Sequence, residues 1–344
     1  MELSHGAGPI STVGIAIGRI RARFRRHQLL RLIAGRILLG VATVLVVSVL
    51  IFAATQVLPG NAAYAVLGHS ASPEAIHTVE VRLHLNESIF SQYGAWMSGL
   101  AHGDLGTSLA TGVPVWDLAR IRLINSAVLA LAAGLIGSII AISLGVVCAA
   151  RKDSRFDDVV SGIALAVTSM PEFVVVIALV ILFATVVFHV LPGVSMLAPD
   201  AYAWDHLDLL VLPVAALVII IIPYILRMTR AAMIEALESD YIEMSSLDGV
   251  PSWRLLFVHA LPNALPPVVQ VIALTFLYLA GGIVIVEAAM AYPGIGQGLV
   301  NAVSARDIPT IQFIVLTLAA FYVVVNIVAD VIALLLTPRR RIPR

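Results

Sequence analysis

The stretch SDYIEMSSLDGVPSWRLLFVHALPN, residues 239–263, is the longest polar interruption in a sequence otherwise made of long apolar runs. Asp240 is a favourable helix N-cap, and Glu243 three residues later completes a capping box. Gly249 is of a type that commonly follows the last turn of a helix. A short helix is therefore expected from Asp240 to Asp248.

A second helix is expected directly after the first. Pro251 stops the first helix, and Ser252 can cap a helix that begins at Trp253. Pro262 is expected to end or kink this second helix because it lacks an amide hydrogen. The whole polar stretch is therefore expected to be structured.

The first of these helices is expected to carry an apolar stripe with acidic edges. Three or four residues separate neighbouring members of the set Tyr241, Met244, Leu247 and Asp248. Such spacings put side chains on one face of a helix. A helix lying on lipid headgroups is the alternative interpretation, but such a helix normally has Lys or Arg on its polar face. Because the charges here are acidic, the pattern favours docking to a partner protein.

The composition is that of a polytopic membrane protein. The 344 residues are 60% hydrophobic and 12% charged, and the mean hydropathy is +0.99. Six runs are long enough to span a bilayer, at about residues 37–57, 124–150, 159–191, 209–227, 266–290 and 311–336. The first run is longer than the apolar part of a signal peptide and is interpreted as an uncleaved span. The expected fold class is therefore all-α, with six transmembrane helices.

Basic residues orient these spans. With the N-terminus inside, 17 of the 21 Lys and Arg residues fall in cytoplasmic segments, and the exceptions are Arg82, Arg120, Arg122 and Arg306. The opposite orientation would invert this bias. Both termini and the stretch 239–263 are therefore expected on the cytoplasmic side, with residues 1–30 as an Arg-rich extension and 337–344 as a basic tail.

The largest segment outside the membrane, residues 58–123, is expected on the outer face. Ser72 followed by Pro73 predicts a helix toward Leu85, and a second helix is expected over 88–101. Gly-rich turns at 102–107 follow these helices. Together they are expected to form a small extracytoplasmic helical cap between spans one and two.

The sequence contains no recognisable catalytic or phosphate-binding motif. Its only lysine, Lys152, is not preceded by the glycines of a phosphate-binding loop, so no ATP site is expected in this chain. A single cysteine, Cys148, excludes an intrachain disulfide or a thiolate cluster. The net charge of zero gives no indication of nucleic acid. The histidines of the outer segment are interpreted as solvated or structural, not as metal ligands: His69, His77, His84 and His102.

Three acidic residues lie inside expected spans: Glu172, Glu287 and Asp330. Each costs ~2.5–3.5 kcal/mol on insertion scales, so each is expected to face protein or water. For Glu287 the alternatives are a hydrogen bond to a neighbouring helix or backbone amide, and a place along a substrate path. Asp330, four residues after Asn326, favours a helix-packing role. Glu172 follows Pro171, where a kink is expected.

The prolines allow another kind of transporter. Discontinuous helices are typical of ion-gradient-driven secondary transporters. Breaks in such helices would be expected at Pro171, Pro192, Pro213 and Pro223. In that alternative the three intramembrane acids would act as proton sites. Activity of this chain alone under a pH gradient would favour it.

The stretch 239–263 resembles the EAA-x3-G-x9-I-x-L-P loop of permeases from binding-protein-dependent ABC importers, through Glu243-Met244-Ser245, Gly249, His259, Leu261 and Pro262. Met244 and Ser245 stand where the pattern has alanines, and His259 stands at its isoleucine. Further stretches resemble the DppB/OppB branch, the permeases for dipeptides and oligopeptides: 58–60, 102–108, 169–173, 259–263, 281–287, 292–296 and 305–307. Asn61 replaces an aspartate common in that branch, and the N-terminal extension is longer. The similarity covers residues 31–341.

This resemblance implies a type I ABC importer transmembrane domain that forms half of a pathway for dipeptides or oligopeptides. It divides the chain into a first span with the extracytoplasmic segment, 31–122, and a core of five helices, 123–336. Residues 239–263 become a coupling loop, whose contacts to an ATPase are expected from Tyr241, Glu243, Met244, Leu247, Asp248, Gly249, His259 and Pro262. Glu172, Glu287 and Asp330 remain candidates for pathway or structural roles.

The partners implied by the resemblance are a homologous DppC/OppC-like permease, two ABC ATPase subunits or one fused ATPase, and an extracytoplasmic substrate-binding lipoprotein. ATP and Mg would be bound by the ATPase, so this chain itself needs no cofactor, and its expected location is the bacterial inner membrane among lipid. The same branch includes permeases for nickel, glutathione, haem and oligosaccharides. These cargoes remain alternatives to peptides.

Overall fold

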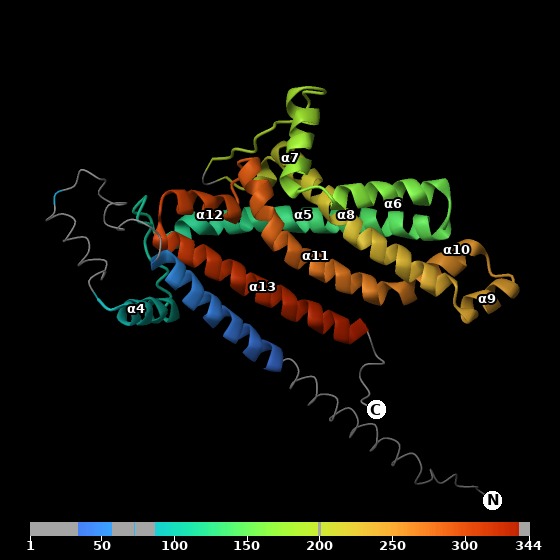
Figure 1. The fold of residues 1–344 in the computed structure, drawn as a ribbon, viewed down its shortest axis with the longest axis horizontal. Coiled ribbons are helices and arrows are strands. Elements are labelled where there is room, and N and C mark those ends of the chain that lie inside the picture. Colours follow the sequence, from blue (N-terminus) through green and yellow to red (C-terminus); the bar gives the residue numbers. More distant parts are fainter. Residues whose placement is uncertain (1–33, 57–71, 73–86, 199–200, 337–344) are drawn as a thin grey trace, which may run out of the picture.

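The computed structural model describes residues 34–56, 72, 87–198 and 201–336 (Figure 1). These residues form helices and one isolated β-bridge. The helices are Ala34–Gln56, α4 (Ile89–Ala101), α5 (Val115–Ala150), α6 (Arg155–Thr168), α7 (Glu172–Val180), the π-helical turn η1 (Ile181–Thr185), the short helix η2 (Ala203–Asp205), α8 (Leu207–Leu237), α9 (Asp240–Leu247), α10 (Ser252–Arg254), the π-helical turn η3 (Leu255–Ala260), α11 (Leu261–Ala289), α12 (Ile295–Ser304) and α13 (Ile308–Leu336).

The expected all-α polytopic fold is confirmed. Five helices are long and apolar enough to cross a membrane, and a sixth span results if the bent pair α6 and α7–η1 is counted as one. Figure 1 shows the long helices side by side, with α9 and α10 at one end of the bundle and α4 and α12 at the other. The Ala34 end of the first helix and the Leu336 end of α13 point toward the end that carries α9.

The third span, expected over 159–191 with a kink beside Pro171, is sharply bent. It bends by 106° between α6 and α7, and α7 projects from the bundle in Figure 1. The bend falls at Pro171, which lacks an amide hydrogen and keeps Met170 out of the helical conformation. The hydroxyls of Thr168 and Ser169 donate to carbonyls one turn earlier and close the end of α6. The kink expected beside Glu172 is therefore confirmed.

Prolines do not interrupt α8. This helix runs continuously for 31 residues through Pro213 and Pro223, so these two prolines do not mark a discontinuous helix. Pro192 lies in the irregular segment after η1. Among the four prolines of the secondary-transporter alternative, only Pro171 marks a break between helices.

The packing core lies where α5 meets α8. Small residues of α5 face α8 and let the backbones approach closely. A Cβ added at Gly145 would lie 2.6 Å from the Thr229 Cβ, and one added at Gly137 would lie 2.5 Å from the Ile221 side chain. Buried aliphatic residues of α8 such as Leu226 fill the space on either side of this seam.

The polar stretch itself folds partly as expected. The first predicted helix is present as α9, but its N-cap is Ser239 and not Asp240. Of the two outcomes predicted at Pro262, an end or a kink of the second helix, the end is wrong, because α10, η3 and α11 follow one another without a break. Pro262 lies in the first turn of α11, next to the π-helical turn, where a missing amide hydrogen is tolerated. The fifth span therefore begins inside the polar stretch.

The first helix packs on α13 and carries α4 near its outer end. The Gly40 position lies against Val323 of α13, and Gln312 donates to the Thr55 hydroxyl at 2.9 Å. The α4 helix has Ser88 as its N-cap and packs two rings against Phe52. Tyr93 meets it edge-on and Trp96 stacks on it, with ring centroids 5.3 Å and 5.9 Å away. This is the described part of the expected cap.

Several expectations fall outside the described residues. They are the Arg-rich extension 1–30, the helix from Ser72 toward Leu85, the basic tail 337–344 and the histidines of the outer segment other than His102. His102 contacts the Ser98 carbonyl through Nδ1 at 2.7 Å. That contact agrees with a structural role for this histidine.

The α5–α8 seam predicts that a single methyl group at Gly145 is destabilising. Gly145→Ala forces a Cβ against the Thr229 Cβ and the Leu226 carbonyl, which costs about 1–3 kcal/mol as overpacking. Gly162→Ala in α6 is the matched control, because a Cβ there meets open space and alanine is the better helix former. Thermal unfolding in detergent should show a lower midpoint for Gly145→Ala only. Equal midpoints for the two variants would contradict the close packing.

Candidate functional site

The α9 helix projects its apolar side chains away from the bundle. Met244 and Leu247 are 63% and 78% exposed, and Glu243 and Asp248 beside them are exposed as well. Ile242, on the opposite face, is buried in the cluster formed by the cytoplasmic ends of α5, α8 and η3. The helix is thus anchored on one side and offers an apolar stripe with acidic edges on the other, as expected.

Hydrogen bonds fix α9 against the start of the fifth span. The Tyr241 hydroxyl donates to the His259 carbonyl at 2.9 Å and accepts from the Asn263 amide at 2.6 Å. Tyr241 therefore serves mainly to anchor the helix, although its side chain is partly exposed. His259 contributes its backbone to this contact, and Pro262 lies beside it in α11.

Gly249 makes the turn between α9 and α10. Its φ of +79° lies in the left-handed region that side chains disfavour, and its amide donates to the Ser246 carbonyl at 3.0 Å. Val250 then donates to the Ser245 carbonyl at 3.2 Å, which closes the end of α9. The expected role of Gly249 after the helix end is confirmed.

An ion-paired clamp holds the cytoplasmic end of α8 just before α9. Asp157 at the start of α6 is buried, and both its oxygens accept from Arg230 of α8 at 2.6 Å. A second, exposed pair joins Lys152 to Glu238 at 2.5 Å, and this hydrogen bond raises the pKa of the Lys152 ammonium above its ordinary value. We call the Asp157–Arg230 pair the clamp. Sequence reasoning missed it, because the two residues are 73 positions apart.

Glu287 has a structural environment at the outer end of α11. Its carboxylate is fully buried and accepts from the Ser126 hydroxyl at 2.5 Å and from the Gly296 and Gln297 amides at 2.7 Å and 3.3 Å. These amides belong to the first turn of α12, which an anionic group stabilises. Gly294 leaves the space that the carboxylate fills. Of the two alternatives for Glu287, the structure contains the hydrogen bonds to backbone amides.

Asn125 is a residue that sequence reasoning missed. Its side-chain oxygen accepts from the Ala203 amide at 2.9 Å, and its amide donates to the carbonyls of Ala201 and Pro293 at 3.3 Å and 3.2 Å. The Tyr292 hydroxyl donates to the Asn125 carbonyl at 2.8 Å, and burial raises the pKa of this phenol, which keeps it a donor. A polar residue early in a long apolar helix was the available signal.

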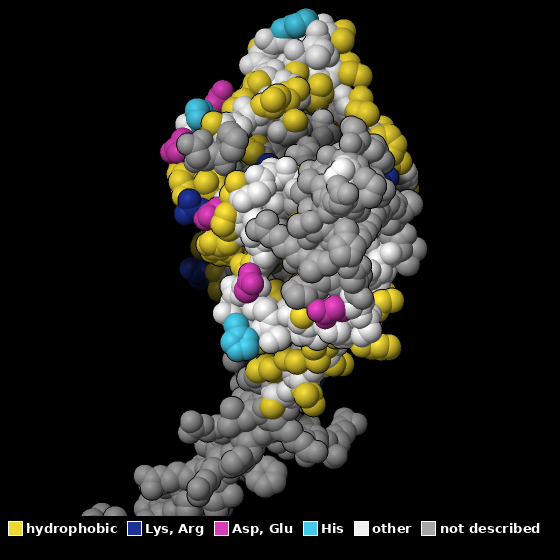
Figure 2. All heavy atoms as spheres, turned by 90° about the vertical axis from the view of Figure 1, so that its left-hand side faces the viewer, with side chains coloured by type: hydrophobic (Ala, Val, Ile, Leu, Met, Phe, Trp, Pro, Cys, Tyr) yellow, Lys and Arg dark blue, Asp and Glu magenta, His cyan; other side chains and the backbone are white. Residues whose placement is uncertain are grey.

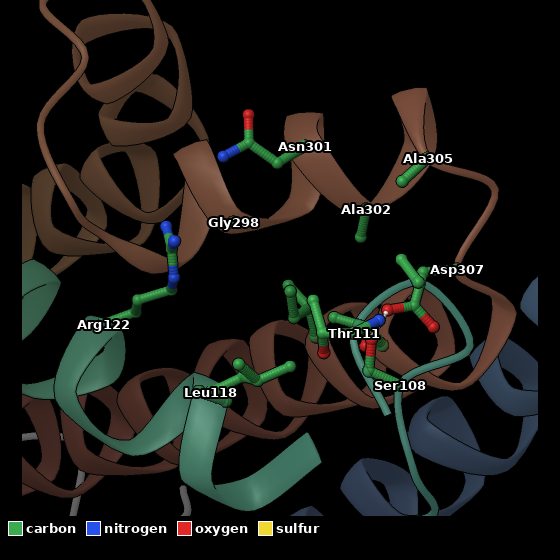
Figure 3. A pocket seen from close by; sticks show the side chains of 13 residues that line it. Ser108, Thr111, Leu118, Arg122, Gly298, Asn301, Ala302, Ala305 and Asp307 are labelled. Carbon is green, nitrogen blue, oxygen red and sulfur yellow. Dashed lines mark hydrogen bonds between the residues drawn. The ribbon is translucent and has the colours of Figure 1, made fainter. Parts of the chain in front are cut away.

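A cavity of about 220 Å³ lies on the outer side between α5, α12 and the loop before α5. Figure 3 shows Arg122 and Asn301 on one side of it and Ser108, Thr111 and Asp307 toward the other. Asp307 is buried and accepts from the hydroxyls of Ser108 and Thr310 at 2.5 Å and 2.7 Å. Asp307 thereby fixes the outer loop to the start of α13.

Asp330 is paired differently from the expectation. Its carboxylate lies 3.1 Å from the Arg36 guanidinium of the first helix, and not with Asn326 of its own helix. The predicted helix-packing role agrees with this contact between two helices. Local sequence spacing could not reveal a partner almost 300 positions away.

Glu172 is partly exposed and differs from the other two acids in its hydrogen bonding. It is the first residue of α7 and accepts a hydrogen bond from the Tyr278 hydroxyl of α11. Its other oxygen, Oε2, is buried without a hydrogen-bond partner. Among the residues that the structure describes, no group of three or more His, Cys, Asp or Glu side chains is placed to hold a metal ion.

These features define a class of protein. A bundle of apolar spans that holds a short helix with an exposed apolar face at its cytoplasmic end is suited to a membrane subunit driven by contact with another protein. Residues 141–342 match the model of binding-protein-dependent transport system inner membrane components, and residues 29–123 match the N-terminal model of such components. The chain belongs to this family. It is therefore the inner-membrane component, not the catalytic subunit, of a transport system that includes a substrate-binding protein and an ATPase.

Similar proteins cover nearly the whole chain. A peptide transport system permease protein of Brucella abortus is 36% identical over 311 residues, which covers 90% of this chain and 98% of the relative. The dipeptide transport system permease protein DppB of Alkalihalophilus pseudofirmus is 34% identical, with 88% and 97% covered. The di/tripeptide transport system permease protein DppB of Pseudomonas aeruginosa is 33% identical, with 91% and 99% covered.

The clamp predicts that two neighbouring carboxylates differ in importance. Asp157→Asn leaves the Arg230 guanidinium without its ionic partner and should cost about 1–3 kcal/mol, whereas Glu238→Gln removes an exposed pair and should change little. Thermal unfolding of the detergent-solubilised protein measures both variants. A midpoint for Asp157→Asn as high as that for Glu238→Gln would show that the clamp does not stabilise this end of α8.

Proposed function

We propose that this chain forms half of the pathway of an ATP-driven importer for dipeptides or oligopeptides. The geometry of α9 supports the proposal that ATP hydrolysis by a partner drives this chain. The buried face of α9 is fixed to the bundle, while Met244 and Leu247 stay exposed. An amphipathic helix of this kind fits an apolar groove on a partner. The partner is an ATPase that supplies ATP and Mg binding.

The coupling site comprises the exposed stripe and the contacts that hold it. Met244 and Leu247 fill the groove, Glu243 and Asp248 border it, and Gly249 sets the turn. Tyr241, His259 and Pro262 connect the helix to the fifth span, so that a movement of α9 reaches the membrane. The ATPase is a pair of subunits or one fused chain.

A second, homologous permease completes the pathway. In support, α7 and η1 project from the bundle with several exposed large apolar side chains. Figure 2 shows hydrophobic side chains over this projection, at the top of the view. Contiguous exposed apolar surface on a membrane protein faces lipid or another subunit. The pair α7 and η1, which bends by 106° from α6, carries such a surface. An extracytoplasmic binding lipoprotein delivers the substrate.

Peptide cargo is supported by the relatives, which are named as permeases of peptide, dipeptide and di/tripeptide transport systems. We retain the division into 1–30, 31–122, 123–336 and 337–344. The N-terminal family match over 29–123 supports the second of these segments. Nickel, glutathione, haem and oligosaccharides are the alternative cargoes. An ion-gradient mechanism is disfavoured, because Glu287 and Asp330 are held by hydrogen bonds and an ion pair.

The cargo is tested by uptake into proteoliposomes that contain this chain and its partner subunits. ATP-dependent entry of an isotopically labelled dipeptide is expected, with competition by unlabelled dipeptides and tripeptides. Nickel, glutathione, haem and an oligosaccharide are the competitor controls. Competition by one of these instead of peptides would reject the peptide assignment, and uptake by this chain alone under a pH gradient would favour a secondary transporter.

Gly249 provides a test of coupling. Gly249→Val places a β-branched residue at a φ of +79°, which strains or reshapes the turn after α9. Uptake per ATP hydrolysed should fall severalfold, while the protein still inserts into the membrane. Gly249→Asn is the matched control, because asparagine tolerates this conformation. An unchanged ratio of uptake to hydrolysis in the valine variant would refute the coupling assignment.

A further inference from the structure

Four polar or aromatic side chains form a continuous track across α7, α11 and α8. In order along the surface they are Glu172, Tyr278, Tyr224 and Arg227. We call this set the polar track. Glu172 lies inside an expected span, where a carboxylate is costly unless it faces protein or water. Arg227 is the last residue of the fourth apolar run.

At the acidic end of the polar track, only one of the two Glu172 carboxylate oxygens has a hydrogen-bond partner. Tyr278 donates to Glu172 Oε1, while Glu172 Oε2 is buried and has no hydrogen-bond partner. A Cβ at Gly282 would lie 2.9 Å from this oxygen, so the bare backbone of α11 leaves the space in which the carboxylate sits. A carboxylate oxygen shielded from solvent and without a donor is costly, and a donor that reaches it relieves this cost.

The basic end is similarly incomplete. The Arg227 guanidinium stands 5.9 Å from the centre of the Tyr224 ring, and its Nε donates to the Pro223 carbonyl at 3.2 Å. The remaining guanidinium nitrogens stay available on an exposed side chain. Over the part of the chain that the structure describes, neither Glu172 nor Arg227 takes part in an ion pair.

Two tyrosine rings connect these ends. Their centroids are 5.6 Å apart with a tilt of 47°, and the side chains are 42% exposed at Tyr278 and 36% exposed at Tyr224. The 5.6 Å and 5.9 Å steps run from the Tyr278 ring to the Arg227 guanidinium and together match about three residues of an extended peptide, at about 3.6 Å per residue. Glu172 lies one hydrogen bond beyond the Tyr278 hydroxyl. Opposite charges at the ends and aromatic faces between them complement a short zwitterionic chain.

We propose that the polar track binds the peptide during its passage, with Glu172 receiving the α-ammonium group and Arg227 the carboxylate end. The ammonium supplies the donor that Glu172 Oε2 lacks, and the tyrosines contact the intervening residues. This assignment rests on the proposed peptide import and adds the site and the part of the substrate that it recognises. The competing explanation is that Glu172 only stabilises the first turn of α7.

The test uses the complete importer with its binding protein in proteoliposomes. Glu172→Gln should lower the initial rate of dipeptide uptake about 10- to 100-fold, the value of one hydrogen bond to a charged group. ATP hydrolysis stimulated by the loaded binding protein should persist. Glu172→Asp should recover part of the uptake, and Asp330→Asn is the control, since this acid is paired with Arg36 outside the polar track.

Photolabelling gives a readout independent of transport rate. A dipeptide with a free amino group and a benzophenone side chain should label the segment around Tyr278 in the wild-type complex, and Glu172→Gln should abolish this label. A wild-type complex that imports no dipeptide would overturn the proposed function itself. A wild-type complex that imports dipeptides, with uptake and labelling unchanged in Glu172→Gln, would overturn only the polar track. Equal losses of uptake, hydrolysis and thermal stability would assign Glu172 to α7 stability and likewise overturn it.

Discussion

The close packing of α5 against α8 is the constraint on which the other parts of the molecule depend. Lipid chains are as apolar as helix surfaces, so helices in a bilayer associate through tight contact and polar bonds instead of hydrophobic burial. Gly137 and Gly145 allow that contact. The two helices have 36 and 31 residues, more than the ~20 needed to cross the hydrocarbon core. One tightly packed pair therefore reaches both surfaces and supports polar sites at each end.

Those polar sites follow one rule, since backbone groups near the membrane must find partners inside the protein. Glu287 accepts from the first turn of α12, Asn125 bonds the segments on either side of it, and Asp307 fixes the outer loop to α13. Asp157 is saturated by Arg230. Glu172 is the carboxylate in the described spans that keeps a buried oxygen without a partner. A carboxylate whose hydrogen bonds are all made inside the protein has a structural role. Glu172, whose hydrogen bonds are incomplete, is the candidate for binding a substrate.

The sequence predicted the features that depend on local chemistry. The length of the apolar runs predicted the spans, and a glycine at the end of a helix predicted the turn at Gly249. Pro171 predicted the break in the third span. The errors concern contacts between distant residues or competing local signals. Pro262 was expected to end or kink a helix, but the helix continues past it next to a π-helical turn. Asp330 pairs with Arg36 of another helix. Apolar spans also hide which face points inward, so the polar track could not be recognised from periodicity.

The same helix connects the proposed peptide site to the coupling helix. Arg227 of the polar track and Arg230 of the clamp lie one turn apart on α8, and α9 follows two residues after the end of α8. The stretch from Arg227 to Leu237 is one uninterrupted part of α8, so a displacement that α9 transmits to the end of α8 moves Arg227 with it. The clamp makes α6 follow α8, whereas Glu172 lies beyond the bend that begins at Pro171. The two charged ends of the polar track therefore lie on elements that meet at the bend beside Pro171. In the proposed importer, a movement driven from α9 would change their separation and with it the binding of a peptide.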